Sequence, residues 1–235
     1  MKLLNKILTS LAALVLLIGC ASTTVSERHP YVGAKLARPD HIIVHDFAAT
    51  PNDVPAGSTL AGKAVQHSTP QTAEQIETGR RLGASVAREL VADIRDMGLP
   101  AARAADGVKP RVGDIVIRGY FVSIDQGSSE QRMLVGFGSG AAELRAVVEG
   151  YRMTPQGLRL LGSGQTQSGG DKKPGMLVGI ASLAATGNPV GLIVGGASKL
   201  YGEETGSEKI DGIAQRTAKD IADELKVKFK EQGWI

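Results

Sequence analysis

The stretch that decides the fold is Glu143-Leu-Arg-Ala-Val-Val-Glu-Gly-Tyr-Arg-Met153, then Thr154-Pro-Gln-Gly157, then Leu158-Arg-Leu-Leu-Gly-Ser-Gly-Gln-Thr-Gln167. In the first run, Leu, Ala and Val alternate with Glu, Arg and Val, which is the period of a strand with two different faces. The proline and glycine of the second run are typical of a turn. The whole stretch therefore predicts an antiparallel β-hairpin over residues 143–167.

Two further strands are expected upstream of this hairpin. Residues 114–125 are rich in Ile, Val, Tyr and Phe, which favour an extended strand. The run Ile42-Ile-Val44 is short, apolar and β-branched, which is typical of a buried strand. Residues 48–70 contain prolines, glycines and an Asn-Asp pair, so we expect a loop there.

A long helix is predicted over residues 72–97. It opens with Thr72-Ala-Glu-Gln75, the pattern of a capping box, and its apolar residues repeat every three or four positions. Gly79 and Gly83 fall on this apolar stripe, so another part of the chain should pack closely against them. Gly98 follows the last apolar residue and ends the helix.

A second helix is predicted at the end of the chain, over residues 208–231. It follows another capping box, Thr205-Gly-Ser-Glu208, and carries its own apolar stripe. Together with the strands, this order predicts an α+β fold: a mixed, mainly antiparallel sheet with two amphipathic helices on one face.

The N-terminus carries the pattern of a lipoprotein signal. Lys2 and Lys6 precede the apolar run 7–18, which ends in Leu17-Ile-Gly-Cys20. This order marks bacterial lipoproteins for cleavage before the cysteine. An ordinary secretory signal with an unrelated cysteine is the alternative. We expect residues 1–19 to be a signal peptide and Cys20 to be lipidated.

The expected domain organisation follows from this signal. Residues 20–40 lack periodicity and are expected to be a lipidated tether, and residues 41–235 a single α+β domain. Ala21 and Ser22 follow the cysteine, and neither is the aspartate usually associated with inner-membrane retention. We therefore expect a cell-envelope protein anchored through lipid to the periplasmic face of the outer membrane.

Composition excludes several classes of protein. Cys20 is the only cysteine, so an exported chain has no internal disulfide. The signal takes two lysines with it, and the formal net charge then falls from +3 to +1. Aromatic residues make up 4% of the chain and no basic run occurs, so we expect no nucleic-acid partner.

A glycine-rich repeat interrupts the domain at residues 171–204. Gly175-Met-Leu-Val-Gly179 recurs 16 positions later as Gly191-Leu-Ile-Val-Gly195. The Gly-x-x-x-Gly spacing lets two helices approach until their backbones touch. We expect a helical hairpin insertion in which these four glycines make helix or oligomer contacts. A packed hairpin or linker, a contact between protomers and a segment that dips into lipid all remain open.

The motifs that could indicate a nucleotide site or a metal site lie in sequence contexts that do not suit those sites. Gly136-Phe-Gly-Ser-Gly-Ala141 precedes an expected strand instead of a helix, and no Lys-Ser/Thr follows it, so we interpret it as a turn. His41 and His45 are four residues apart on an expected strand, which separates them by about 13 Å, too far to share one metal ion. We expect no catalytic residue, no cofactor and no metal site.

Several stretches resemble the bacterial lipoproteins that carry domain of unknown function 4410. They are Arg38–Asp40 with Ile42–Phe47, Gly113–Gly127, Arg132–Gly140, and Arg216–Lys219 with Gln232–Ile235. The resemblance extends over nearly all of the chain after the signal and implies an envelope lipoprotein. It implies no activity and no functional residue besides the lipidated cysteine.

Two functional hypotheses remain from the sequence. The first is a non-catalytic envelope module that binds a protein or a glycan, or assembles with itself. The second is a membrane-active or self-assembling oligomer built on the Gly-x-x-x-Gly repeat. The expected partners are the membrane, through the lipid anchor, and an envelope protein or a second copy of the chain.

Overall fold

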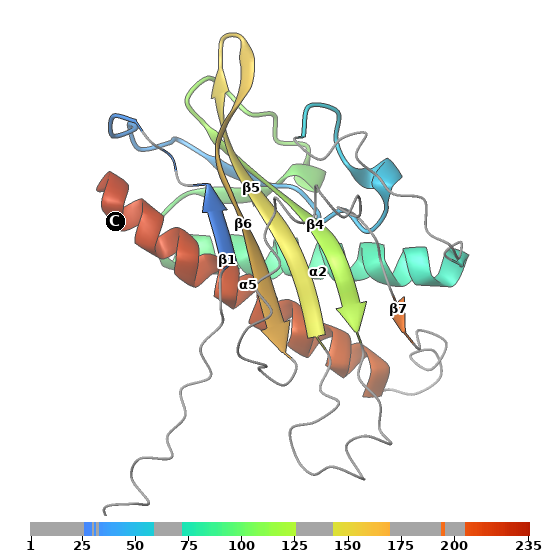
Figure 1. The fold of residues 1–235 in the computed structure, drawn as a ribbon. Coiled ribbons are helices and arrows are strands. Elements are labelled where there is room, and N and C mark those ends of the chain that lie inside the picture. Colours follow the sequence, from blue (N-terminus) through green and yellow to red (C-terminus); the bar gives the residue numbers. More distant parts are fainter. Residues whose placement is uncertain are drawn as a thin grey trace, which may run out of the picture.

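The computed structural model describes residues 26–29, 31, 33–58, 72–125, 143–169, 194–195 and 205–235. These residues form an α+β fold with one mixed sheet and two long helices (Figure 1). The strands are β1 (Ser26–His29), β2 (Ile42–Val44), β3 (Ala101–Arg103), β4 (Ile115–Asp125), β5 (Glu143–Thr154), β6 (Gly157–Gly169) and β7 (Val194–Gly195). The helices are α2 (Ala73–Asp96) and α5 (Thr205–Gln232), with short 3-10 turns η2 (Pro51–Asp53) and η3 (Ala104–Asp106).

The predicted hairpin is confirmed and forms the centre of the sheet. β5 and β6 pair antiparallel from Thr154 opposite Gly157 to Glu143 opposite Gly169. Gly157 adopts a φ of 113°, which a residue with a side chain rarely adopts. The register shifts by one residue after Gly150, which marks a β-bulge.

The rest of the sheet is built outward from this hairpin. The strand order is β1-β6-β5-β4-β2-β3, and β7 pairs with the far half of β4. β4 is antiparallel to β5, whereas β2 is parallel to both β3 and β4. β2 and β3 are parallel because α2 lies between them in the chain. The helix returns the chain to the end of the sheet where β2 began.

Both helices pack against the same face of the sheet and against each other. α2 contacts β2 and β3, and α5 contacts β5 and β6. The capping box of α2 is present: Gln75 N donates to Thr72 Oγ1 at 3.2 Å, and Thr72 N donates to Gln75 Oε1 at 2.9 Å. The main core fills the space between helices and sheet and includes Leu90, Ile94 and Ile221.

Close packing at Gly83 is also confirmed. A Cβ added to Gly83 would collide with the carbonyl oxygen of Phe47, and one added to Gly119 would collide with the Phe47 ring. Phe47 N donates to Gly83 O at 3.3 Å. The absence of two side chains therefore lets the backbone after β2 wedge between α2 and β4.

Two expectations differ from the structure. Residues 26–29 were expected in a tether, but they form β1, whose backbone pairs antiparallel with the edge of β6. Gly195 was expected in a helix, but Val194 and Gly195 form β7, which pairs in parallel with Ile124 and Asp125. The reason is that β4 extends well beyond β2, and this part of its backbone can hydrogen-bond to a further strand.

Candidate functional site

A groove between the second half of α5 and the sheet is a concave site formed by the described residues. Its volume is about 210 Å³ and it is partly open to solvent. The floor comes from the helix-facing side of β4, β5 and β6, and one wall comes from α5. The residues of the floor and the α5 wall include Val148, Gly150, Leu161, Gly162, Gly164, Thr166, Ile221, Leu225 and Phe229.

The groove exists because glycines take the place of side chains at its floor. Gly150 lies opposite Gly162, and Val148 lies opposite Gly164. A Cβ added to Gly150 would meet no atom closer than 4.0 Å, so the space above this residue is open. Beside the groove, α5 is joined to β6 by a hydrogen bond, in which Ser168 Oγ donates to Asp220 Oδ2 at 2.6 Å.

The far wall of the groove is made by the C-terminus and the segment after β1. Trp234 Nε1 donates to Leu36 O at 2.9 Å, and Leu36 N donates to Gln232 Oε1 at 2.7 Å. The rings of Trp234 and Phe229 lie 5.3 Å apart between centroids. Tyr31 also lines the groove, and the Arg159 guanidinium lies 5.9 Å from the centroid of its ring. These contacts hold the wall in place.

The groove leaves apolar surface uncovered. Five partly buried hydrophobic residues pack against the main core of the described structure, and four of them line the groove: Leu36, Val148, Leu161 and Leu225. Charged residues occur only among those contributed by α5, as Glu224, Lys228 and Glu231. Lys228 Nζ lies 2.8 Å from Glu231 Oε2, and the two side chains form an ion pair on the rim of the groove. The arrangement suits a ligand that is mostly apolar.

The opposite face of the sheet holds a buried polar cluster around Glu149. Its side chain is fully buried, and its Oε2 accepts hydrogen bonds from Tyr120 OH and Tyr151 OH, both at 2.6 Å, and from Ser58 Oγ at 3.0 Å. The cluster ties β4, β5 and the loop after η2 together. A buried polar side chain needs such hydrogen bonds, because burying it without partners is destabilising.

Burial and the neighbouring carboxylate change the titration of the two tyrosines. Burial is the larger cause and the hydrogen bond to Glu149 is the second, and together they raise the pKa of Tyr151 to about 12. The same two causes, in the same order, raise the pKa of Tyr120 further. Both phenols therefore keep their protons at neutral pH and act as donors, which indicates a structural role for the cluster.

A basic side chain lies beside this cluster. Arg118 is 9% exposed, and its guanidinium lies 5.2 Å from the centroid of the Tyr151 ring. Its Nε makes no hydrogen bond within the described part of the chain. Burial and the charge of Arg118 together lower the pKa of His45, whose imidazole is therefore neutral at neutral pH.

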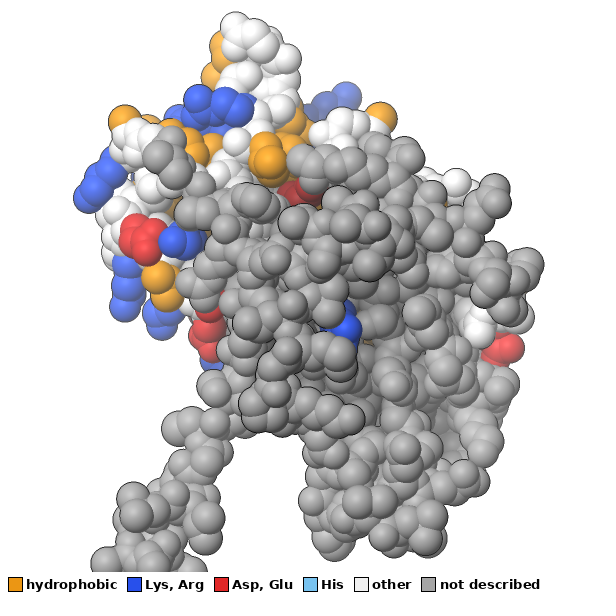
Figure 2. All heavy atoms as spheres, in the orientation of Figure 1, with side chains coloured by type: hydrophobic (Ala, Val, Ile, Leu, Met, Phe, Trp, Pro, Cys, Tyr) orange, Lys and Arg blue, Asp and Glu red, His pale blue; other side chains and the backbone are white. Residues whose placement is uncertain are grey.

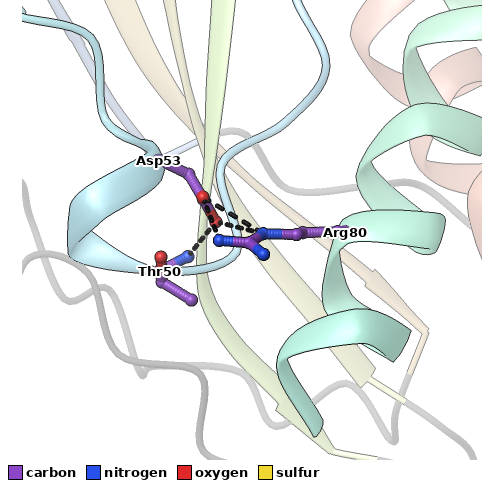
Figure 3. A network of polar contacts seen from close by, with 3 residues as sticks. All are labelled: Thr50, Asp53 and Arg80. Atoms are coloured by element: carbon purple, nitrogen blue, oxygen red, sulfur yellow. Dashed lines mark hydrogen bonds and ion pairs between the residues drawn. The ribbon is translucent and has the colours of Figure 1, made fainter. Parts of the chain in front are cut away.

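The loop that carries Ser58 is held to α2 by an ion pair (Figure 3). Arg80 donates from Nη2 to Asp53 Oδ1 at 2.7 Å, and Thr50 N donates to Asp53 Oδ2 at 3.1 Å. Burial alone would raise the pKa of Asp53, but the hydrogen bonds from Arg80 and Thr50 outweigh it and hold the pKa below its ordinary value. The pair is exposed to solvent on the arginine side.

Most of the site residues predicted from the sequence lie outside the described residues. These are Cys20, Gly175, Gly179 and Gly191, together with the glycine turn at residues 136–141. Gly195 is in β7, away from the groove. His41 Nδ1 lies 3.6 Å from Asp114 Oδ1 at the start of β4. Within the described ranges, no three His, Cys, Asp or Glu side chains come together as a metal site would require.

Sequence reasoning missed both the groove and the Glu149 cluster. The signal for the cluster was a carboxylate two positions before a tyrosine, on the face of the strand that also carries Val147. The signal for the groove was the glycine series Gly150, Gly162 and Gly164 within the two strands of one hairpin. None of the helices that the structure describes is long and apolar enough to cross a membrane.

Comparisons with known proteins identify one family, and distantly similar solved structures include two of the same protein. The family model "Domain of unknown function (DUF4410)" matches residues 42–187. The PelC dodecamer from Paraburkholderia phytofirmans is 16% identical with a TM-score of 0.35, covering 71% of this chain and 98% of that chain. A point variant of the same dodecamer is 16% identical with a TM-score of 0.32, covering 70% and 91%. No curated protein matched the chain.

The family match extends over more than half of the chain, from β2 through the end of β6 and beyond. It includes the hairpin, the groove floor and the Glu149 cluster. The chain therefore belongs to the DUF4410 family, a family defined by a domain of unknown function.

Proposed function

We propose that this chain is a lipoprotein held by Cys20 at the periplasmic face of the outer membrane, where its folded part binds or assembles with envelope components and catalyses no reaction. The observation that carries the proposal is that the ends of four strands lie at one end of the sheet. β1 begins, β4 ends, β5 begins and β6 ends at the same end of the sheet (Figure 1). The β5–β6 turn lies at the opposite end.

This arrangement supports an orientation relative to the membrane. Cys20 precedes Ser26, the first residue of β1, by six residues, which reach at most about 20 Å. An anchor at Cys20 would therefore hold this end of the sheet near the lipid. β6 has 13 residues, so the β5–β6 turn would stand roughly 40 Å further from the membrane.

The opposite end has the chemistry of a surface that meets water-soluble partners. In the view of Figure 2, Lys and Arg side chains gather beside the β5–β6 turn, and both basic and acidic side chains lie along the C-terminal part of α5. Exposed charged side chains of one sign attract partners of the other sign. The groove opens along the same part of α5, so both surfaces are available to envelope components.

A second candidate function is favoured by where the glycine-rich repeat is attached. The repeat follows Gly169, the last residue of β6, and precedes Thr205, the first residue of α5. Gly169 lies at the end of the sheet where we place the anchor. We therefore keep the alternative that the repeat makes a membrane-active or self-assembling oligomer.

The orientation is tested by fluorescence quenching on vesicles that carry the lipidated protein. With Cys20 acylated, an introduced cysteine is the only free thiol. A fluorophore on Ser207→Cys, in the first turns of α5, should be quenched by spin-labelled lipid, and one on Gln156→Cys, in the hairpin turn, should not. Equal quenching at the two sites, or the reverse order, would contradict the proposal.

A substitution in the repeat tests the second candidate function, the membrane-active or self-assembling oligomer. Gly179→Leu should lower the mass of the protein in light scattering if the repeat joins protomers, since a leucine prevents close backbone contact. Binding of the lipid-free chain to vesicles should fall if the repeat enters lipid. If mass and vesicle binding both stay at the wild-type values, the alternative is wrong.

A further inference from the structure

We propose that the groove between α5 and the sheet, together with Arg152 and Arg159 at its hairpin end, binds an extended peptide segment of an envelope protein. The segment presents apolar side chains to the groove and a carboxylate to the two arginines. This inference deepens the proposed function by naming the class of partner, and it rests on that proposal in one respect, since the hairpin end is the end that we place away from the membrane.

Two arginines lie opposite each other on the hairpin, next to the groove. Arg152 of β5 pairs with Arg159 of β6, so their side chains lie on the same face of the sheet. Arg152 follows Gly150 of the groove floor by two positions, and side chains two positions apart along a strand share a face. Both arginines therefore lie on the groove side of the sheet, about 7 Å beyond this part of the floor.

The charges of these two arginines favour an anionic group at the hairpin end of the groove. Within the described ranges, neither Arg152 nor Arg159 forms an ion pair with an acidic side chain. The Arg159 guanidinium instead lies 5.9 Å from the ring centroid of Tyr31, which lines the groove. Like charges directly opposite each other in a sheet are destabilising. A carboxylate bound between the two guanidinium groups would relieve this repulsion and accept hydrogen bonds from both.

The size and lining of the groove favour apolar side chains. An apolar cavity of about 150 Å³ accommodates benzene. With about 210 Å³, the groove has room for roughly one or two aliphatic side chains. Four partly buried residues would lose their remaining contact with water when the groove is filled: Leu36, Val148, Leu161 and Leu225. A glycan is disfavoured, because its hydroxyl groups would be buried against this lining without hydrogen-bond partners.

The dimensions of the groove define the spacing of the peptide. The groove follows α5 from Ile221 to Phe229, which is about 12 Å along the helix. In an extended peptide, side chains at alternate positions point to one side and lie about 7 Å apart. Two apolar side chains at alternate positions would therefore lie along the groove. A carboxylate at the next alternate position would reach Arg152 and Arg159, which gives the pattern apolar-x-apolar-x-Asp/Glu, in either chain direction.

The test offers the protein a defined set of peptides. The chain from residue 20 with Cys20→Ser carries no lipid and retains all described elements. The peptides are capped heptapeptides in which Ser alternates with three test positions, each occupied by Leu, Ser, Glu or Lys. Trp234 lines the groove and is the only tryptophan, so its fluorescence reports saturable binding. Peptides with two Leu and an outer Glu should bind most tightly, and Lys in place of this Glu should weaken binding at least about tenfold.

A charge exchange assigns the carboxylate to the arginines. Arg159→Glu should reverse the preference, so that the peptide with Lys binds more tightly than the peptide with Glu. Lys226→Glu is the matched control, because it changes the net charge by the same amount at an exposed position of α5 that does not line the groove. This control should keep the preference of the wild type.

A second pair of variants assigns the apolar side chains to the groove. Gly150→Val fills open space above the floor without a steric conflict and should weaken binding of the Leu peptides at least about tenfold. Leu160→Ser is its control, since Leu160 is 39% exposed and does not line the groove. Thermal melts verify that each variant is folded.

Several results would overturn the proposal. They are the absence of saturable binding by any peptide, equal binding of the Glu and Lys peptides to wild type, and equal binding of the Leu peptides to folded Gly150→Val. A wild-type dimer that Gly150→Val dissociates would assign the groove to a second copy of the chain, and tighter binding of laurate than of every peptide would assign it to an amphiphile. Because the lipid-free chain is used, failure of this test would leave the anchor at Cys20 untouched.

Discussion

At the scale of single residues, Gly83 and Gly119 decide how the backbone after β2 fits into the core. Phe47 lies between them, and its ring also packs against Phe121 with 5.7 Å between centroids. The conflict at Gly83 involves a backbone oxygen, which cannot rotate away as a side chain can. A methyl group at Gly83 would therefore force α2 away from Phe47.

Gly83→Ala should destabilise the protein by about 2 kcal/mol or more, as overpacking of a core does. In a helix without this conflict, the same substitution would stabilise by about 1 kcal/mol. Gly150→Ala is the matched control, because its new Cβ meets open space. Urea unfolding of both variants decides the matter, and a Gly83→Ala variant as stable as wild type would contradict the account.

The Glu149 cluster predicts a loss of stability in alkali. The pKa of Tyr151 is about 12 in the folded protein against an ordinary value of 10.0, so the folded state holds a proton that the unfolded state releases between these values. The resulting stabilisation is complete below pH 10 and is lost as the pH rises toward 12. Tyr120, whose pKa is also raised, acts in the same direction.

Urea midpoints measured near neutral pH and at about pH 11 should therefore differ, with the lower midpoint in alkali. Tyr151→Phe removes one of the two tyrosines and should make the difference smaller, although the variant loses one donor to Glu149. A midpoint difference that is the same in wild type and Tyr151→Phe would show that Tyr151 does not titrate as described.

At the scale of elements, the two helices and the hairpin form the stable framework. α2 and α5 contact each other and bury Leu90 and Ile221 in the core between helices and sheet. Leu90→Ala and Ile221→Ala should each cost about 2–5 kcal/mol, since both side chains are at most 2% exposed. Lys226→Ala, on an exposed position of α5, should change stability by less than about 0.5 kcal/mol. Unfolding curves that give equal losses for all three variants would contradict the packing.

The elements that sequence could predict are those with a local signal. The hairpin has strand alternation and a Thr-Pro-Gln-Gly turn, and α2 has a capping box followed by an apolar stripe. β1 has neither, because Ser-Glu-Arg-His is polar and joins the sheet through backbone hydrogen bonds at its edge. The sequence predicted a helix where β7 is found. The strand that pairs with β7 is the far half of β4, and local sequence does not indicate such a distant pairing.

The candidate site was harder to predict because it joins distant parts of the chain. The groove brings Leu36, Gly150 and Trp234 together, and local patterns say nothing about which distant residues meet. Glu149 and Ser58 are likewise 91 positions apart. The glycines of the floor were visible in the sequence, but their shared face appears only once the register of β5 and β6 is known.

At the scale of the whole molecule, we propose different tasks for the two ends of the sheet. One end receives the N-terminal segment and the ends of β4 and β6, and we propose that it faces the membrane. The other end carries the β5–β6 turn and positively charged side chains (Figure 2). This division depends on the anchor at Cys20, which makes lipidation of that residue the central claim.

The most direct test of the central claim is mass spectrometry of the N-terminal tryptic peptide of the protein isolated from membranes. The account predicts a peptide that begins at Cys20, ends at Arg28 and carries the added mass of three acyl chains and a glycerol on the cysteine. A chain that still begins at Met1, or one cleaved elsewhere with a free thiol at Cys20, would contradict it.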